Sequence, residues 1–221
     1  PIDIDGRVLL YSVIHDISDR RRAEAALVKA NRALNTLNGA NATLIHAATE
    51  ERLLAEICRV VVETGGYCHA LVALPEPEGV RVAAHNAVAP SCLQDAGIER
   101  RGGVSGDGLA GAAIRTRQPA LVQDWHSDPR GEPWREAALA QGFASSIALP
   151  LLSGSDAIGA LAIHAAEADA FNGDEFRLLS DLANNLAFGI AARRETAERQ
   201  RAERAERESE ARLRLLLEST A

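Results

Sequence analysis

The sequence is poor in several residue types, and each shortage excludes a class of protein. It has no methionine, and aromatic residues make up only 4% of its 221 positions. No apolar run approaches the roughly 20 residues that a membrane-spanning helix needs, and no signal peptide is visible after Pro1. The absence of methionine at position 1 predicts that Pro1 is not a natural N-terminus. Any targeting segment is therefore expected outside this stretch.

Basic charge is scarce relative to acidic charge. The formal net charge is −7, which argues against a basic surface that binds nucleic acid. Arginine-rich runs occur at 20–22 and 193–214, but glutamate and aspartate are interleaved with them. These runs are not predicted to form a phosphate-binding patch. Neither a nucleic-acid partner nor a membrane segment is expected.

Cysteine is also scarce, with three residues at positions 58, 68 and 92. They form no C-x-x-C pair and no zinc-ligand spacing, and the histidines show no ligand spacing either. No metal site is predicted. Cys58, on an apolar helical face, and Cys68, at the start of a strand, are expected to pack in the core. An odd number of thiols favours reduced cysteines and a cytoplasmic protein over a disulfide framework.

What the chain does contain is two long, charged, helix-forming stretches, 18–63 and 174–218, around an apolar middle. In the first stretch a heptad pattern predicts a parallel homodimer, because an Asn at an a position pairs with its copy across the axis. The alternative is an amphipathic helix packed on its own domain, and Gly39 would favour a kink or break. The a positions are Leu27, Leu34 and Asn41, and the d positions are Ala30, Leu37 and Leu44.

The second stretch repeats apolar residues from Phe176 to Ile190 at helical spacing. One face is expected to pack on the sheet and the other on a partner helix. Beyond Arg194 the repeat fades, and a loosely specified seam suits a linker that switches between two registers. The alternative is a solvated single helix. The predicted dimer interface comprises Leu27, Leu34, Leu37, Asn41, Leu44, Leu186 and Ile190.

Both ends of the chain carry a short motif next to a predicted helix. A strand predicted at 7–15 runs into residues 16–27, DISDRRRAEAAL, which are similar to the D-I-T-E-R-K-x-A-E-x-x-L exit segment of PAS sensor domains. The resemblance implies that the chain begins with the last strand and exit turn of a PAS domain. The tail at 213–221 is similar to the entry helix of a following PAS domain, with a plain amphipathic helix end as the alternative.

The middle of the chain alternates short apolar strands with short helices. Turn-forming residues separate strand pairs at 75–79 and 153–156, and Asn172 with Glu175 predicts a capping box. The order of elements predicts an α+β fold, with an antiparallel sheet and its first and last helices packed together on one face. Strands are expected at 68–75, 80–86, 120–123, 145–152 and 157–165, and short helices at 109–116 and 134–141.

Four short motifs stand in order along this middle part. They are similar to G-x-x-G-x-A-x-x-T-G-x-P at 108–119, to a D-x-x-x-D-P loop at 124–129, to a strand pair S-x-x-x-x-P-L and G-x-L at 145–151 and 158–163, and to the start of a final helix at 171–175. Together and in this order they resemble the GAF domain family. The resemblance implies a GAF-like antiparallel β-sheet with helices on its faces, and the heptad and helical spacing described above adds long N- and C-terminal coiled-coil helices.

No catalytic residues are predicted. GAF-like proteins that bind bilins carry a Cys-His pair where this chain has Pro133 and Trp134, so the thiol for bilin attachment is missing. With His164 expected as a core or rim histidine, neither bilin nor haem is expected. Free methionine sulfoxide reductases of the family use clustered pocket cysteines, whereas the three cysteines here are scattered. The chain itself is not expected to be an enzyme, and a sulfoxide-reductase-type activity is a remote alternative.

The resemblance implies a small-molecule pocket between the sheet and the loops after the third strand. Both tryptophans fall in this region, and an indole suits a pocket wall that offers one hydrogen-bond donor. The alternative is that they only plug the loop onto the sheet. The candidate ligand-binding residues are Trp125, His126, Trp134, Phe143 and Ser146.

The resulting hypothesis is a cytoplasmic sensor or regulatory module. It would bind an unidentified small molecule, or take a signal from a PAS neighbour, and pass it through a parallel dimer to a histidine kinase or cyclic-di-GMP enzyme elsewhere in the parent chain. The competing hypothesis is a structural dimerisation module without a ligand. The predicted division is 1–17 (end of a PAS domain), 18–42 (coiled-coil linker helix), 43–194 (GAF domain), 195–212 (helical signalling linker) and 213–221 (start of a following PAS domain).

Overall fold

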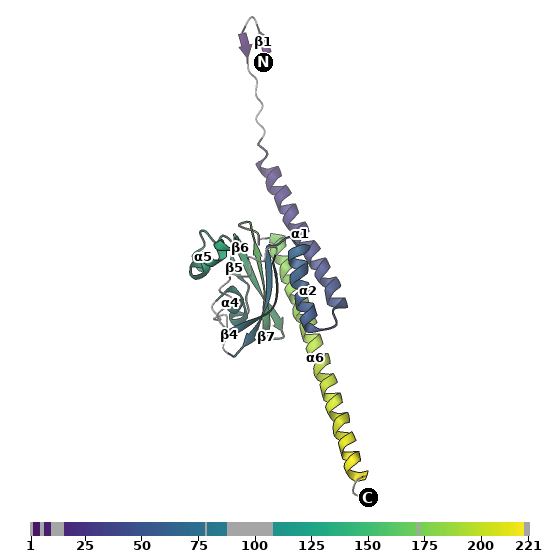
Figure 1. The fold of residues 1–221 in the computed structure, drawn as a ribbon. Coiled ribbons are helices and arrows are strands. Elements are labelled where there is room, and N and C mark those ends of the chain that lie inside the picture. Colours follow the sequence, from purple (N-terminus) through teal and green to yellow (C-terminus); the bar gives the residue numbers. More distant parts are fainter. Residues whose placement is uncertain are drawn as a thin grey trace.

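The computed structural model describes residues 2–4, 7–9, 16–77, 79–87, 108–171 and 173–218. Two layers of helices enclose a sheet, with α1, α2 and α6 on one side and α4 and α5 on the other (Figure 1). In chain order the elements are β1 (Ile2–Ile4), β2 (Arg7–Leu9), α1 (Ser18–His46), α2 (Glu50–Glu63), β3 (His69–Glu76), β4 (Gly79–Ala87), α4 (Leu109–Thr116), β5 (Ala120–Val122), the 3₁₀ helix η1 (Pro129–Trp134), α5 (Arg135–Ala140), β6 (Ser145–Ser153), β7 (Asp156–Ala165) and α6 (Gly173–Glu218).

The sheet has five strands in the order β4-β3-β7-β6-β5. Every neighbouring pair is antiparallel, which confirms the α+β fold with an antiparallel sheet. The β6–β7 hairpin turns at Gly154, whose φ of 62° suits glycine. At the N-terminus, β1 and β2 form a separate antiparallel hairpin. The rest of the strand predicted at 7–15 lies outside the described residues.

The main core lies between the sheet and helices α2 and α6. Its centre is built from aliphatic side chains that alternate along the strands, so that one face of each strand is apolar. Full burial of each such side chain stabilises the fold by about 1.5–3 kcal/mol. The largest fully buried members are Tyr67, Phe171, Leu53, Ile57, Ile147, Leu149, Leu151, Leu161, Ile163, Leu179, Leu182 and Leu186.

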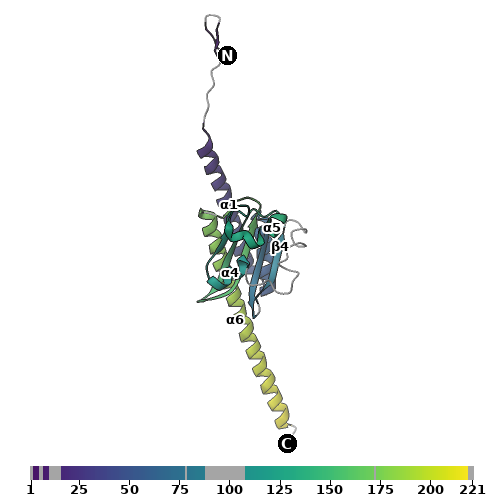
Figure 2. The same ribbon diagram turned by 90° about the vertical axis from the view of Figure 1, so that its left-hand side faces the viewer.

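Helices α1 and α6 lie side by side and run in the same direction (Figures 1 and 2). Arg32 of α1 pairs with Glu175 near the start of α6, and further along the amide of Asn185 donates to Asn41 Oδ1 at 2.9 Å. Still further along, α6 approaches α1 so closely that a Cβ at Gly189 would lie 2.4 Å from a methyl carbon of Leu44. Residue numbers at these contacts increase along both helices in the same direction, so α1 and α6 are parallel.

This pairing changes the interpretation of the predicted dimer seam. Leu186 and Ile190 are fully buried in the chain's own core, so they have no surface to offer a second copy. Leu37 and Leu44 pack partly against the same core. Asn41 meets Asn185 of its own chain instead of a copy of itself. The physical reason is that α6 of the same chain already covers the face of α1 that carries Leu37, Asn41 and Leu44. This arrangement corresponds to the alternative of an amphipathic helix packed on its own domain.

The outer stripe of α1 remains uncovered. Leu27 is 63% exposed and Leu34 44% exposed, so these two a positions face solvent. Helix α1 also passes through Gly39 without a break. The glycine lets α2 pack closely at this point, because a Cβ there would lie only 2.8 Å from Val60 of α2. The break comes later, between His46 and Glu50, where the Thr49 hydroxyl caps α2 by accepting from the Arg52 N–H. No helix in the described ranges is long and apolar enough to cross a bilayer.

Candidate functional site

A row of polar side chains crosses the central strands on the sheet face away from α2 and α6. The register places His69 of β3 opposite His164 of β7, and His164 opposite Ser146 of β6. Because side chains alternate along strands, all three share a face with Leu71 and Ala162, which belong to the smaller core under α4. His69 is 4% exposed, His164 7% and Ser146 0%. Buried polar groups of this kind require hydrogen-bond partners.

Trp125 joins this row from the loop after β5. Its indole N–H donates to Ser146 Oγ at 2.7 Å, and Ser146 Oγ lies 2.6 Å from His164 Nδ1. The loop is held tightly: Arg135 donates to the Trp125 carbonyl at 2.9 Å, and a Cβ at Gly131 would lie 2.7 Å from the indole ring. Trp125, Ser146 and His164 therefore form one continuous buried chain of hydrogen bonds.

The His164 ring also stacks with two further aromatic rings, Phe143 and His69. Phe143 lies 4.3 Å from His164 between ring centroids, with an interplanar angle of 13°. His69 lies 5.2 Å from His164 and 5.8 Å from Phe143, again nearly parallel. We call the set Trp125, Phe143, Ser146, His69 and His164 the histidine cluster.

Both buried histidines are neutral at physiological pH. Burial, with a smaller contribution from nearby His85, lowers the pKa of His69 from 6.5 to about 4. Burial, then the neighbouring His69, holds the pKa of His164 well below its usual value. Within the described parts of the chain, both ring nitrogens of His69 and Nε2 of His164 have no hydrogen-bond partner. Three unpaired buried nitrogens are the unusual chemical feature of this face.

The structure brings together three of the five candidate ligand-binding residues, Trp125, Phe143 and Ser146. Trp134 is half-buried and packs against the same small core as Trp125 and Phe143. His126 does not join them: its ring is exposed and lies 3.3 Å from the Asp124 carboxylate.

Sequence reasoning missed His69 and His164. His69 begins β3 and His164 lies next to the end of β7, and only the register of β3, β7 and β6 shows that the two rings meet. The available signal was their position on one alternating face of strands that were correctly predicted.

The cysteines do not gather at the cluster. Cys58 lies in the main core on α2, and burial raises the pKa of its thiol to about 12. Cys68 is partly buried beside the Trp125–Phe143 core, and its thiol donates to the His164 carbonyl at 3.0 Å. Cys92 lies outside the described residues. No group of three metal-ligating side chains occurs in the portion of the chain that the structure describes.

The loop between β7 and α6, residues 166–171, contacts residues next to the cluster. Ser145, which precedes Ser146, donates to the Glu167 carbonyl at 2.7 Å. Gln123, two residues before Trp125, donates to the Phe171 carbonyl at 2.8 Å and accepts from the Asp169 N–H at 2.8 Å.

The same loop also contacts α1. Lys29 of α1 donates to the Asp169 carbonyl at 2.7 Å, and Arg32 of α1 pairs with Glu167. Arg32 also reaches the buried Glu175 of α6 at 2.6 Å, where the Tyr67 hydroxyl donates as well, at 2.6 Å. One short loop therefore touches the surroundings of the cluster and α1, and its partner Arg32 also binds α6.

Glu175 differs from its predicted role. It was expected to form a capping box with Asn172, which lies outside the described residues. Instead its Oε1 accepts from both Arg32 and Tyr67, and the Arg32 guanidinium lies 4.4 Å from the centre of the Tyr67 ring. Burial, then the negative charge of Glu175, raises the pKa of Tyr67 far above its usual value, so the phenol remains a donor.

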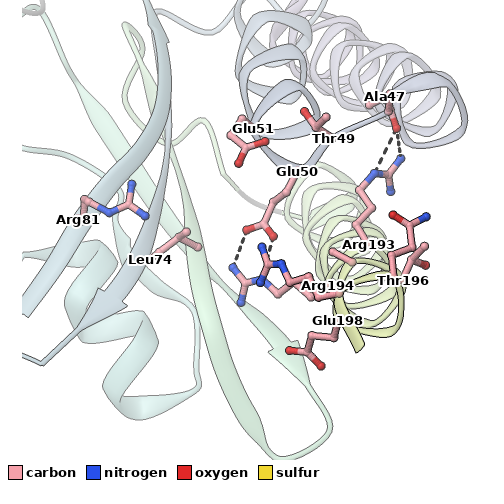
Figure 3. Close-up of a pocket in the computed structure, with 14 residues that line it drawn as sticks. Ala47, Thr49, Glu50, Glu51, Leu74, Arg81, Arg193, Arg194, Thr196 and Glu198 are labelled. Carbon is pink, nitrogen blue, oxygen red and sulfur yellow. Dashed lines mark hydrogen bonds and ion pairs between the residues drawn. The ribbon is translucent and has the colours of Figure 1, made fainter. Parts of the chain in front are cut away.

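A concave region lies away from the histidine cluster, at the other end of the α1–α6 pair (Figure 3). It is an open pocket of about 800 Å³ between the α1–α2 turn and α6. Arg193 donates to the Leu44 and Ala47 carbonyls, and Arg194 pairs with Glu50 at 2.6 Å. Since both guanidinium groups are already engaged within the chain, this region joins α6 to the end of α1 and to the start of α2.

Comparison with known proteins agrees with the architecture. The family model for the GAF domain matches residues 47–191. No curated protein matched the chain. Among solved structures, the chain is similar to the free methionine-R-sulfoxide reductase from Neisseria meningitidis in complex with its substrate, with 19% identity, 76% of this chain and 93% of that chain covered, and a TM-score of 0.61.

Two further similar structures are GAF domains of other proteins. The GAF domain from a phosphoenolpyruvate-protein phosphotransferase of Coxiella burnetii is 18% identical, with 76% and 98% of the two chains covered and a TM-score of 0.60. The phycoerythrobilin-bound GAF domain from a cyanobacterial phytochrome is 15% identical, with 75% and 98% covered and a TM-score of 0.60. These likenesses establish the fold alone, because one fold hosts many functions. Because the family model covers well over half of the chain, the chain belongs to the GAF domain family.

Proposed function

We propose that this chain is a regulatory GAF module that converts an event at the histidine cluster into a change in the packing of α1 against α6. The event is the binding of a small molecule or the arrival of a signal from a neighbouring domain through α1. The observation that carries the proposal is the 166–171 loop, which contacts the surroundings of the cluster and α1 and comes just before α6 in the chain.

The contacts of this loop are suited to transmission. Ser145 and Ser146 are adjacent, and one bonds the loop while the other bonds His164. A shift of β6 at the cluster would therefore move the Glu167 carbonyl. Glu167 in turn pairs with Arg32, whose main partner is the buried Glu175. Buried charged contacts of this kind are costly to leave unpaired, so they favour a small number of discrete arrangements.

The output lies beyond α6 in this proposal. Helix α6 continues to Glu218, and residues 198–209 are exposed along its described surface. Exposed ion pairs such as Arg199 with Glu203 contribute only a few tenths of a kcal/mol each. We infer a cytoplasmic parent chain in which α6 connects to a histidine kinase or a cyclic-di-GMP enzyme, with PAS domains as neighbours at 1–17 and 213–221.

The proposal includes a parallel homodimer with a revised surface. Leu27, Leu34 and Ile45 of α1 are all exposed, and at 100° per residue they fall within about 20° of one another on one stripe. Phe188 of α6 is 77% exposed and precedes Gly189, which contacts Leu44. Exposed apolar residues aligned along parallel helices favour a second copy as their partner.

Hydrogen–deuterium exchange on the purified chain tests the relay without a ligand. Ser146→Ala removes the hydroxyl that links Trp125 to His164. We expect faster exchange in residues 166–171 and in the first turns of α6, because these backbone contacts depend on the position of β6. Ser153→Ala, at the exposed end of the same strand, is the matched control. A Ser146→Ala effect confined to β6 and β7 would contradict the relay.

A thermal-shift screen of small molecules separates the sensor from a structural dimerisation module. A ligand that binds the native state raises the unfolding temperature in proportion to the logarithm of its concentration. Stabilisation that is lost in Ser146→Ala would support binding at the histidine cluster. A broad screen without any stabilising compound would favour the structural module.

A further inference from the structure

The two ends of the α1–α6 pair are held together in different ways. At one end Arg32 of α1 binds Glu175, which is 1% exposed and also accepts from the Tyr67 hydroxyl. Breaking that ion pair would leave a buried charge without its counter-charge, which is strongly destabilising. At the other end two adjacent residues of α6, Arg193 and Arg194, make the contacts, and we call this pair the arginine lock (Figure 3).

The arginine lock holds two helices at once. Arg193 donates to the Leu44 carbonyl at 2.6 Å and to the Ala47 carbonyl at 2.8 Å, at the end of α1, where the last carbonyls have no partner within their own helix. Arg194 donates to both carboxylate oxygens of Glu50, the first residue of α2, at 2.9 and 2.6 Å. Adjacent side chains on a helix diverge by about 100°. Helix α6 therefore cannot rotate about its axis without breaking one of these contacts.

The arginine lock is also the last polar connection before α6 leaves the domain. Beyond Arg194, no described residue of α6 makes a hydrogen bond or an ion pair with another element, and residues 198–209 are exposed. The direction and the rotational position of this exposed segment are therefore set at the lock.

Each charged group of the lock has an alternative if the contact opens. Glu198 lies one turn beyond Arg194 on the same side of α6 (Figure 3), at the i,i+4 spacing at which opposite charges pair. It is exposed and has no ion pair among the described residues. Arg193 keeps its bond to the Gly189 carbonyl within α6. Since Arg194 and Glu50 are 38% and 23% exposed, opening the lock leaves no charge buried and unpaired.

The surroundings of the lock leave room for such an opening. The open pocket of about 800 Å³ lies between the α1–α2 turn and α6, and Glu198 is part of its lining. The Thr49 hydroxyl caps α2 by accepting from the Arg52 N–H, so the start of α2 does not depend on Arg194. Glu50 also stays at a helix N-terminus, where a negative charge is favoured.

Resting on the function proposed above, we propose that the arginine lock is the releasable end of the relay and that the Arg32–Glu175 contact is its pivot. In the closed state, which is the one described above, Arg194 binds Glu50. In the open state Arg194 binds Glu198, and α6 swings away from the α1–α2 turn while its first turns stay in place. The swing changes the direction in which α6 continues towards the output.

Native-state hydrogen–deuterium exchange of three variants tests the lock without a ligand. Glu50→Gln removes the closed partner of Arg194, and Glu198→Gln removes the open partner. Glu51→Gln is the matched control, because Glu51 is an exposed residue of the same turn of α2 and has no ion pair in the described part of the chain. The measured segment is the last turn of α1, residues 43–47, which Arg193 holds.

The two partners of Arg194 should have opposite effects. We expect Glu50→Gln to speed exchange in residues 43–47 about fivefold, Glu198→Gln to slow it about twofold, and Glu51→Gln to match the wild type. All three variants remove one negative charge, so a general effect of charge would move them in the same direction. Equal exchange in Glu50→Gln and Glu51→Gln, or exchange in Glu198→Gln that is not slower than in the wild type, would overturn the proposal.

The pivot is judged in the same measurement. Residues 174–182 at the start of α6 should keep wild-type exchange in all three variants, because Arg32 still binds Glu175. An equal change in 174–182 and in 43–47 would show that α6 moves as a whole, and would refute the pivot. The relay is tested separately by Ser146→Ala, which leaves the lock intact, so the lock and the relay can fail independently.

Discussion

Glu175 illustrates what a single residue reveals only in three dimensions. Its position near the start of α6 fits a helix-capping role by local sequence rules. In the fold it is 1% exposed and bonded to Arg32 and Tyr67, which lie 143 and 108 positions away in sequence. No local pattern encodes such partners. The same holds for His69 and His164, because their meeting depends on strand register, whereas Trp125, Phe143 and Ser146 could be selected from a motif-rich region.

At the residue scale, the neutral histidines predict a loss of stability in acid. The pKa of His69 falls from 6.5 in the unfolded chain to about 4 in the fold. The unfolded state therefore binds the proton more readily than the folded state. As a result, the stability that neutral His69 contributes is fully present above pH 6.5 and is lost as the pH falls towards 4. We expect His69 alone to lower the free energy of unfolding by roughly 3 kcal/mol at pH 4.

Urea unfolding of the wild type and His69→Phe between pH 7 and pH 4 measures this effect. The difference in unfolding free energy between the two chains should shift in favour of the variant as the pH falls, because phenylalanine takes no proton. Curves that stay parallel over the whole range would show that His69 does not carry the dependence.

At the scale of elements, the sequence predicted most of the strands and short helices but not how the helices divide. The helix predicted at 109–116 is α4 itself, and the hairpin predicted around 153–156 is the β6–β7 turn. These depend on local turn chemistry and alternation. The stretch 18–63 is instead two helices that divide after His46. Gly39, where a kink or break was the alternative, is a point of close contact with α2. Such contacts become visible only when the elements are packed.

Gly65 offers a test of how tightly these elements are joined. A Cβ at this position would lie 2.3 Å from the Thr36 hydroxyl of α1 and 2.4 Å from the Val61 carbonyl. Backbone cannot move aside cheaply, so Gly65→Ala should lower the free energy of unfolding by about 1–3 kcal/mol.

Gly108→Ala is the matched control for Gly65→Ala, because nothing lies within 4 Å of a Cβ there, and it should cost less than about 1 kcal/mol. Both are measured by urea unfolding. Equal losses in the two variants would mean that the packing of α1 against the end of α2 can accommodate the added methyl group.

At the scale of the whole molecule, the chain already contains a parallel helix pair before any second copy is added. The sequence predicted that the first and last long helices pack together, and it assigned their seam to a dimer because a heptad pattern does not distinguish a partner in the same chain from a partner in another. The apolar residues that remain exposed in the folded chain are the ones available to a second copy: Leu27, Leu34, Ile45 and Phe188.

The proposed dimer makes a direct prediction. Leu34→Asp places a charge on the exposed stripe of α1 and should convert a dimer to a monomer at tens of micromolar, measured by light scattering. Asn35→Asp adds the same charge about 100° around the helix at a position that is also exposed, and should leave the dimer intact. A wild-type chain that is already monomeric at this concentration would contradict the dimer.

The parallel course of α1 and α6 has a consequence for how such modules can be combined. The chain enters along one helix axis and leaves along a neighbouring axis with the same polarity, at the opposite end of the molecule (Figure 1). A domain attached before α1 and a domain attached after α6 are therefore placed in series. Additional units of this design could be added to the row without reversing the direction of the chain, and both chains of a parallel assembly would keep each pair of equivalent domains at the same level.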